Sequence, residues 1–527
     1  MGREINLDSI RVLDKQIEEY ERIIIELKRT RNSLLNVTTL LPPEILGNIF
    51  HRNVIPDGDF GGLSKGSYNF LLVCHHWFQV ASNTPELWCF WGNSISDWTH
   101  RHARCGTGPL DLVLEGYPTN ELDDKLRDAL QDHAARDTIR RVHLTGFFAT
   151  KILNPVISSI VAGGEEIRSS GVESFIVESS GGNDVVDISR FFSRYHLPNL
   201  KRLRLVGCRI SSWDLLKSRT TTLTTLELTG VLSPITPTLS DLLSILSSNP
   251  LLQDLTLSYS LVSPVVDGEW PSPLVTLRHL QKFRLTSDFG HAFGLLNRLE
   301  LPDKMKSLYL DLRHCSPLDT SQILGPYLGD RVRRHGRFPG GGLGLLTTHS
   351  YSVLKLYVGD THKRADFPTT AWFMTVDVVW GGALGKKETE QIGLDLIARI
   401  PRERVINLQT ALPILRSEEL CVEMRDLTYL HLVEVDLSTW FIESDIHGPH
   451  TFKELLPSLD RIMITWPTLT SGDWSPFTNF LSRRAAVGNR ISSLRLDCHP
   501  HMDDDVLETI KFAVKTFEDK ESHGGGS

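Results

Sequence analysis

The sequence predicts a mixed α/β chain in which a long N-terminal helix and a small helical module precede a solenoid of strand–helix repeats. Three observations predict this architecture. Apolar residues follow a heptad spacing between residues 10 and 34, two short amphipathic helices are expected within 41–91, and an LxxLxL pattern recurs from 139 to 496. The chain has 527 residues, which exceeds one ordinary core, so several domains or an extended repeat array are expected.

The predicted domains follow these boundaries in order. They are a heptad helix at 1–38, a helical module at 39–95, a repeat solenoid at 105–515 with an irregular insertion near 315–425, and a flexible tail at 516–527. Residues 1–30 carry charges throughout, which is not typical of a signal peptide. No segment holds 18 uncharged apolar residues, so no transmembrane helix is expected.

Charge and cysteine usage limit the partners that the chain is expected to have. The net charge of -8 does not predict a nucleic-acid or membrane surface. The seven cysteines are odd in number and widely spaced, and they contain no CxxC pair. We therefore expect neither a disulfide framework nor a zinc cluster, and a reducing compartment, cytoplasmic or nuclear, fits this usage.

The heptad segment is predicted to be one uninterrupted helix. Its apolar positions recur at alternating steps of three and four, as in a coiled coil. They are Ile10, Leu13, Ile17, Tyr20, Ile24, Leu27 and Leu34, with Arg31 in the one polar slot. The stripe can form a homodimer through residues 10–34 or pack on its own chain. Such a short coiled coil with an arginine in its seam is marginal, which favours packing on the chain.

The module begins with the sequence LPPEILGNIF at residues 41–50. Two prolines suit the first turn of a helix, and Glu44 faces the positive end of the helix dipole. A linker rich in glycine and aspartate follows at about 56–67, and a second helix is expected over YNFLLVCHHWFQVA at 68–81. The segment TPELW at 84–88 is expected to form a turn and then begin a new helix or a strand.

The order LPPEIL, LLVCHHWFQVA and PELW resembles the F-box family, over residues 41–91. In that family the three pieces build a three-helix module that docks on the Skp-type adaptor of cullin-based ubiquitin ligases. A heptad helix leading into this start is similar to the arrangement in fungal F-box-like proteins. The resemblance implies an adaptor-binding set of Leu41, Pro42, Ile45, Leu46, Ile49, Leu72, Val73, Cys74, Trp77, Val80, Leu87 and Trp88. The 56–67 linker is longer than the family's usual loop.

The repeated segments match the leucine-rich repeat template. The closest copy is Leu200-x-x-Leu203-x-Leu205-x-x-Cys208-x-Ile210. Further copies start at Ile139, Val172, Leu223, Leu252, Leu280, Met305, Leu427, Leu459 and Ile491. Their spacing is near the roughly 20–29 residues of such repeats, though irregular. The LxL pair places two side chains on one face of a strand, and stacked neighbours bury that face as a continuous core.

Segments between the repeats have less regular patterns. Residues 239–246 have helical spacing and are followed by Asn249-Pro250 as a stop signal. The basic, glycine-rich segment 331–344 is expected to be a flexible loop or an insertion. It lacks the closing Gly-Lys-Ser/Thr of a phosphate loop. The pairs at 354–356 and 376–378 are expected to be strands of degenerate repeats.

No motif predicts catalysis. His100, His102 and Cys105 form a loose HxHxxC group without an apparent fourth zinc ligand. The chain contains no HExxH, and no GxSxG or GxGxxG between a strand and a helix. We expect no enzyme, no catalytic residue, no cofactor and no metal site.

The resemblance and the repeats together imply the substrate-recognition subunit of an SCF-type cullin–RING ubiquitin ligase. The Skp-type adaptor, and through it a cullin, would bind the module, and an unidentified target protein would bind the repeats. The alternative is a ligase-independent scaffold in which the F-box-like bundle caps the apolar end of the solenoid, as repeat arrays require. An enzyme would need a pocket in the irregular region at 311–425.

Overall fold

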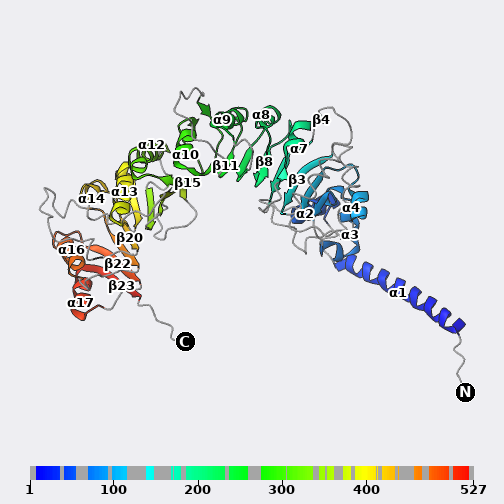
Figure 1. Ribbon diagram of the computed structural model, residues 1–527. Coiled ribbons are helices and arrows are strands. Elements are labelled where there is room, and N and C mark those ends of the chain that lie inside the picture. The colour runs from blue at the N-terminus through cyan, green and yellow to red at the C-terminus, as the bar shows by residue number, and fades with distance from the viewer. Residues whose placement is uncertain are drawn as a thin grey trace, which may run out of the picture. The chain divides into compact units, whose positions relative to one another are not determined.

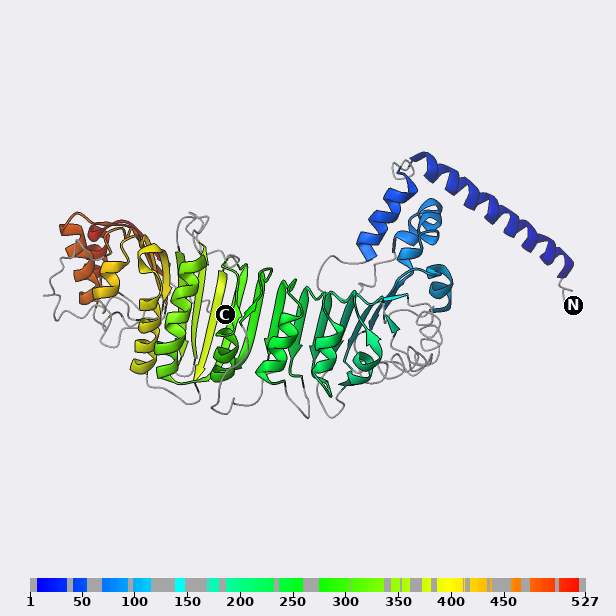
Figure 2. The same ribbon diagram turned by 90° about the horizontal axis from the view of Figure 1, so that it is seen from above.

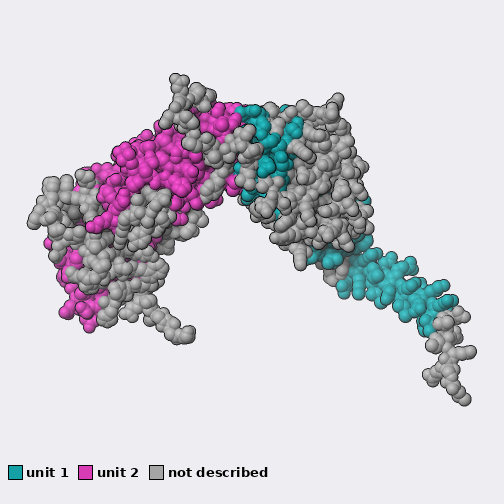
Figure 3. Space-filling view, in the orientation of Figure 1, with its two compact units in different colours: residues 1–223, 231–234 teal, residues 224–230, 235–527 magenta. Residues whose placement is uncertain are grey.

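The computed structural model has a mixed α/β fold with a large, mostly parallel sheet (Figure 1). The structure describes residues 7–35, 41–54, 69–92, 98–114, 138–146, 168–169, 171–179, 186–231, 237–258, 274–303, 305–335, 343–350, 353–360, 372–380, 386–410, 412, 418–433, 437, 456–465, 474–497 and 502–520. Figure 3 shows two compact units: unit 1 is residues 1–223 and 231–234, and unit 2 is 224–230 and 235–527.

Unit 1 begins with helical elements, of which the last, at the HxHxxC group, was not predicted from the sequence. They are α1 (Leu7–Leu35), α2 (Pro43–Val54), η2 (Asn69–Leu72), α3 (His75–Ser82), η3 (Pro85–Leu87) and α4 (Trp98–Cys105). The backbone N–H groups of Ile45 and Leu46 both donate to the carbonyl of Pro42, which fixes the first turn of α2. The Cys74 side chain lies at the N-cap of α3, and its sulfur accepts from the Trp77 N–H at 3.5 Å. The predicted single helix at 68–81 is therefore a 3-10 turn and an α-helix separated at Cys74.

A parallel sheet follows in unit 1. Its strands pair in chain order as β1 (Phe90–Gly92), β2 (Leu110–Leu114), β3 (Ile139–Thr145), β5 (Ser174–Glu178) and β8 (Arg202–Val206). Short two-stranded pairs join β4 (Arg168–Ser169) to β7 (Tyr195–His196) and β6 (Val186–Asp187) to β9 (Cys208–Arg209). Helices α7 (Ser189–Arg194) and α8 (Asp214–Arg219) lie between later strands. Phe175 of β5 stacks on Phe191 of α7 with ring centroids 4.3 Å apart, so that helix closes the core over the sheet.

Unit 2 continues the same design with more strands. In spatial order they are β10 (Thr225–Thr229), β11 (Asp254–Ser258), β13 (Lys282–Asp288), β15 (Ser307–Cys315), β18 (Trp372–Trp380), β17 (Val353–Asp360), β16 (Leu343–Ser350), β19 (Val405–Thr410), β20 (Tyr429–Val433), β21 (Arg461–Thr465), β22 (Ile491–Asp497) and β23 (Val514–Lys520). A separate pair joins β12 (Val275–Thr276) and β14 (Leu299–Glu300).

The helices of unit 2 lie along one side of this sheet (Figure 1 and Figure 2). They are α9 (Leu239–Ser247), α10 (Phe289–Leu296), α11 (Pro317–Asp319), the π-helical turn η4 (Thr320–Leu324), α12 (Gly325–His335), α13 (Lys386–Arg399), η5 (Arg402–Arg404), α14 (Glu418–Glu423), α16 (Ser475–Ala486) and α17 (Asp504–Ala513). The described helices offer none that is long and apolar enough to cross a membrane.

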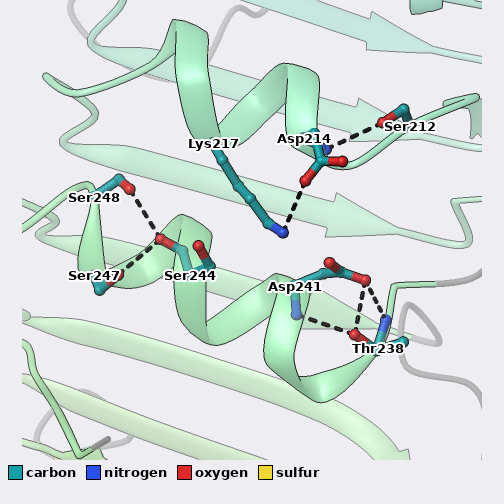
Figure 4. Close-up of polar contacts among 8 residues, drawn as sticks. All are labelled: Ser212, Asp214, Lys217, Thr238, Asp241, Ser244, Ser247 and Ser248. Carbon is teal, nitrogen blue, oxygen red and sulfur yellow. Dashed lines mark hydrogen bonds and ion pairs between the residues drawn. The ribbon is translucent and has the colours of Figure 1, made fainter. Parts of the chain in front are cut away.

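Local chemistry explains why α9 forms where the sequence predicts it. The Thr238 hydroxyl accepts from the Asp241 N–H at 3.1 Å, and the Asp241 carboxylate accepts from the Thr238 N–H at 3.0 Å (Figure 4). This reciprocal capping box satisfies two backbone donors at the helix start. Beyond the last turn, the Asn249 side-chain amide donates to the Ile245 carbonyl at 2.8 Å. The predicted helix and its stop are confirmed.

The register of the strands explains the LxxLxL pattern. Leu226, Leu255, Phe283 and Leu308 lie directly opposite one another on successive strands of unit 2. All four are buried, while the residues that alternate with them point to the other face. A strand lies at every LxxLxL copy that the sequence singles out, in both units, and these strand predictions are confirmed.

The interval from 315 to 425 differs from the irregular insertion that the sequence predicts. Its strands β16, β17 and β18 are members of the main sheet of unit 2, and β17 is antiparallel to both neighbours. Residues 354–356 and 376–378 are strands as predicted, and Leu354 pairs with Val378. The expected loop at 331–344 is also corrected, because its first five residues complete α12 and residues 343–344 begin β16. Residues 336–342 lie outside the described residues.

The cysteines correct another expectation. Cys89 and Cys105 form a disulfide, with their Cα atoms 4.9 Å apart. Wide spacing in sequence did not predict this pair, because α4 folds back beside η3 and β1. The disulfide also occupies the only sulfur of the HxHxxC group. The side chains of His100 and His102 lie outside the described residues.

Candidate functional site

The helical module has its own well-packed core. Phe50 of α2 stacks on Phe70 of η2 with ring centroids 4.4 Å apart, and its centroid is 5.1 Å from that of Trp77 in α3. These contacts bring the C-terminal half of α2 against η2 and the start of α3. The core also contains Leu46, Val80, Ala81, Leu87 and Trp88.

Two polar contacts fix the turn that closes the module. The Trp88 indole N–H donates to the Ala81 carbonyl at 2.8 Å, and the Thr84 hydroxyl donates to the Val80 carbonyl at 2.8 Å. A side chain at Gly47 would lie 3.3 Å from the Thr84 hydroxyl, so α2 approaches this turn closely. The PELW segment therefore locks the end of α3 against α2.

Among the module residues that the structure describes, five large apolar side chains remain on the surface. They are Ile45, Ile49, Leu72, Val73 and Phe78, which we call the apolar face. Ile45 and Ile49 are four residues apart, so they lie on one side of α2. Leu72 is the most exposed of the set, at 86%. Leu72, the last residue of η2, and Val73 follow Phe70, which packs on Phe50 in the C-terminal half of α2.

The predicted adaptor-binding residues divide between core and surface. Leu46, Val80, Leu87 and Trp88 are buried; Leu41, Cys74 and Trp77 are half-buried; Pro42, Ile45, Ile49, Leu72 and Val73 are exposed. The buried members stabilise the module and cannot contact a partner without unfolding it. Phe78 was missed by the sequence reasoning, although it lies beside Trp77 and one residue off the buried stripe of α3. The linker at 56–67 lies outside the described residues.

The core of the module continues into the first strands of the sheet. Phe90 of β1, Val113 of β2 and Cys105 of α4 belong to the same buried cluster as Leu46 and Trp88. β1 pairs with β2 in parallel immediately after the PELW turn. The module therefore covers apolar side chains at the start of the sheet of unit 1.

The second candidate surface is the face of the unit 2 sheet opposite its helices. The Tyr309 hydroxyl donates to the Asp377 carboxylate at 3.1 Å, and the Lys355 ammonium lies 3.4 Å from the same oxygen. The guanidinium carbon of Arg284 is 4.5 Å from the centroid of the Tyr309 ring. Burial and the nearby Asp377 carboxylate raise the pKa of Tyr309 to about 12, so it stays a neutral donor. Asp311 lies opposite Asp377 on the neighbouring strand.

Further along the same face lies another set of polar contacts. The His431 Nε2 atom is 2.9 Å from the Thr465 hydroxyl, and Arg495 makes two contacts of 2.9 Å with the Asp497 carboxylate. This face therefore presents both signs of charge together with aromatic and imidazole rings. Such a surface suits recognition of a polar partner by many separate contacts. Within the part of the chain that the structure describes, no cluster of three or more His, Cys, Asp or Glu side chains could hold a metal ion.

Two histidines predict how stability depends on pH. Burial lowers the pKa of His143 and of His431 from 6.5 to about 4. Arg204 adds to the effect at His143, whereas at His431 Asp497 opposes it and Arg495 adds to it. Between pH 6.5 and pH 4 these imidazoles therefore bind protons in the unfolded chain but not in the folded chain. The free energy of unfolding keeps its full value above about pH 6.5 and decreases as the pH falls toward about 4. For the buried His143 the loss is about 3 kcal/mol.

Chemical unfolding of wild type and His143→Gln at pH 7.0, 5.5 and 4.5 tests this dependence. The wild-type midpoint should fall more steeply on acidification than that of the variant, because the variant lacks the titrating imidazole. Carboxylates titrate in both proteins and cancel in the comparison. Parallel pH profiles would contradict the role of His143.

No protein-family model matches the chain, and no curated protein matches its sequence. Two surfaces are the candidate functional sites: the apolar face of the helical module and the polar face of the unit 2 sheet.

Proposed function

We propose that this chain is the substrate-recognition subunit of an SCF-type cullin–RING ubiquitin ligase. An F-box-like module at residues 39–95 binds the Skp-type adaptor, and a leucine-rich repeat solenoid binds the target protein. The observation that supports this proposal is the apolar face, because the module leaves five large apolar side chains in water although its core is complete without them.

Ile45 and Ile49 lie on one side of α2, and Leu72 and Val73 are adjacent in the chain. Large exposed apolar side chains of this kind are typical of interaction sites. Ile45, Ile49, Leu72 and Val73 belong to the residues that the resemblance assigns to the adaptor, and none of the four is needed to fill the module's core. An adaptor that covered them would remove their apolar surface from water, which is favourable at roughly 25 cal/mol per Å². Phe78 extends the same chemistry to the surface of α3.

The polar face of the unit 2 sheet supports the second half of the proposal. Arg284, Tyr309 and Lys355 present cationic and aromatic groups, and the partly exposed Asp311 presents a carboxylate. Asp377 is buried and holds Tyr309 and Lys355 in place. A target peptide with charges of both signs could pair with these groups. Ubiquitin transfer would be carried out by other subunits, so this chain would need no catalytic residue of its own.

The alternative function is a ligase-independent scaffold in which the module caps the solenoid. The core shared by Leu46, Trp88, Phe90 and Val113 favours a capping role. Deleting residues 1–91 does not separate the two functions, because the deletion removes most of β1 and exposes the apolar side chains beside it. Surface variants that leave the shared core intact are the sharper test.

Binding of a purified Skp-type adaptor to the full-length chain, measured by calorimetry, tests the proposal. We expect wild type to bind and Ile49→Glu/Leu72→Glu to weaken the dissociation constant by about 100-fold or more, since a hot-spot residue contributes roughly 2 kcal/mol. Circular dichroism and thermal unfolding of the variant should match wild type, because both side chains are exposed.

A matched control replaces exposed leucines outside the module. Leu251→Glu/Leu274→Glu changes the charge by the same amount, at side chains that are also exposed. This variant should bind the adaptor as wild type does. If wild type fails to bind the adaptor, or if both double variants bind equally well, the apolar face does not serve the adaptor and the scaffold function is favoured.

A further inference from the structure

Helix α1 displays its heptad stripe entirely to solvent. Every described side chain from Ile10 to Arg31 is exposed, and so is Leu34. The expectation that this stripe packs on the rest of its own chain is therefore not met in the structure. A helix of 29 residues with an uncovered apolar seam is typically stabilised by packing against another helix.

The charges along α1 are divided between its two halves. Residues 7–21 carry five acidic and two basic side chains, whereas residues 22–35 carry four basic and one acidic side chain. A second copy aligned in parallel would place like-charged halves side by side. A second copy aligned antiparallel would place each acidic half against a basic half, which is the attractive arrangement.

We propose that α1 forms an antiparallel coiled coil with α1 of a second copy of this chain. Alignment of Ile17 with Leu27 of the second copy makes a set of a-to-d layers along the whole stripe. The other layers are Ile10 with Leu34, Tyr20 with Ile24, and Leu13 with Arg31. The e positions then pair Asp14 with Lys28 of the second copy at both ends of the dimer.

The seam arginine distinguishes the two alignments. In a parallel, in-register pair Arg31 would face Arg31 of the second copy at an a position, which places two cations together. In the antiparallel pair Arg31 faces Leu13 and lies beside Asp14 of the second copy. Ile23, at a g position, adds an apolar contact with Ile23 of the second copy near the centre of the helix pair. One like-charged contact remains near the centre, between Glu21 and Glu21 of the second copy. The two Asp14–Lys28 pairs outnumber it.

The antiparallel alignment has a consequence for the assembly. The C-terminal ends of the two α1 helices, which lead into the two helical modules, would lie at opposite ends of the helix pair. A helix of this length spans about 40 Å. The dimer would therefore hold two modules and two repeat arrays apart, an arrangement that allows two-point binding of a target with repeated or multiple recognition sites.

Sedimentation of the full-length protein over a concentration series, with a neighbouring pair of variants, tests the interface. Ile24 lies in the seam and Ile25 lies outside it, and each is 49% exposed in a single copy. We expect wild type and Ile25→Asp to reach twice the 59.4 kDa chain mass. Ile24→Asp should remain monomeric under the same conditions.

Cysteine crosslinking tests the alignment. In the antiparallel dimer, chains carrying Ile10→Cys should form disulfides with chains carrying Leu34→Cys, and neither variant should crosslink with itself. The two positions lie about 36 Å apart along one helix, so the parallel dimer predicts the opposite result, with self-crosslinks only. Wild type treated with the same oxidant sets the background from its native cysteines.

Each outcome decides the proposal. A wild type that stays monomeric at all concentrations, or equal effects of Ile24→Asp and Ile25→Asp, would overturn the dimer and leave α1 to bind a different helix. Self-crosslinking of Leu34→Cys would overturn the antiparallel alignment. The combined variant Asp14→Lys/Lys28→Asp exchanges the paired charges and should restore dimerisation that Lys28→Asp alone weakens by about tenfold.

Discussion

Replacing Trp88 with alanine is expected to destabilise the helical module by about 4 kcal/mol. The indole is buried in the module's core, and its N–H donates to the Ala81 carbonyl at 2.8 Å. The guanidinium carbon of Arg104 lies 4.4 Å from the ring centroid. Alanine at this position leaves a cavity and removes the cation–π contact. It also removes one donor to the Ala81 carbonyl, which still accepts from the Thr84 N–H at 3.2 Å.

Hydrogen exchange monitored by mass spectrometry is the appropriate measurement, because unfolding of a chain with more than one compact unit does not have a single free energy. Amides of residues 69–92 should lose protection in Trp88→Ala, and those of β20 to β22 should keep it. Trp88→Phe retains most of the buried area and loses the indole donor, while the Ala81 carbonyl keeps its bond from the Thr84 N–H, so it should show a loss of about 1 kcal/mol. Wild-type protection in Trp88→Ala would show that the indole is not essential for the module's core.

The two kinds of module variant separate folding from binding. Trp88→Ala should lose adaptor binding together with its folded structure. Ile49→Glu/Leu72→Glu should lose adaptor binding while the amides of residues 69–92 stay protected. A variant of the second kind that lost protection would place its residues in the core, contrary to their exposure.

The repeat strands could be predicted because their physics is local. A strand that buries one face must alternate apolar and polar residues, and each LxL pair shows this alternation within three consecutive residues. Helix α9 could be predicted for a similar reason, since its capping residues and its stop lie within a few positions of its ends. The start of α2 at Pro42-Pro43 could be predicted for the same reason, because its signal is local.

The features that sequence reasoning missed depend on contacts between distant residues. The direction of β17 is set by its pairing with β16 and β18, and no local pattern in residues 353–360 encodes an antiparallel neighbour. The Cys89–Cys105 disulfide needs the turn of α4. The division of the candidate site into buried Leu46 and exposed Ile45 also needed the structure, because both lie in one apolar stripe of α2.

Arg484 shows how strongly tertiary contacts can override a local pattern. Arg483 and Arg484 end helix α16, where basic residues ordinarily face solvent near the negative end of the helix dipole. Arg484 is instead 1% exposed, and its guanidinium donates to the carbonyls of Leu456 and Leu459 at 3.1 Å each. Burial lowers its pKa to about 10, so it remains charged at neutral pH. Leu456 has a positive φ of 48°, a conformation that this anchor helps to hold.

We expect Arg484→Ala to destabilise the region around β21 by about 4 kcal/mol, since two buried carbonyls would each lose a charged donor at about 1–3 kcal/mol. Amides of residues 456–465 and of α16 should exchange faster, and those of β1 to β3 should not change. Arg484→Lys keeps the charge, but its compact ammonium cannot reproduce the fork of the guanidinium, so an intermediate loss is expected. Arg483→Ala, at the adjacent exposed position, is the matched control and should leave exchange unaffected. Equal effects of Arg483→Ala and Arg484→Ala would mean that the dipole of α16, and not the two carbonyls, sets the contribution of these arginines.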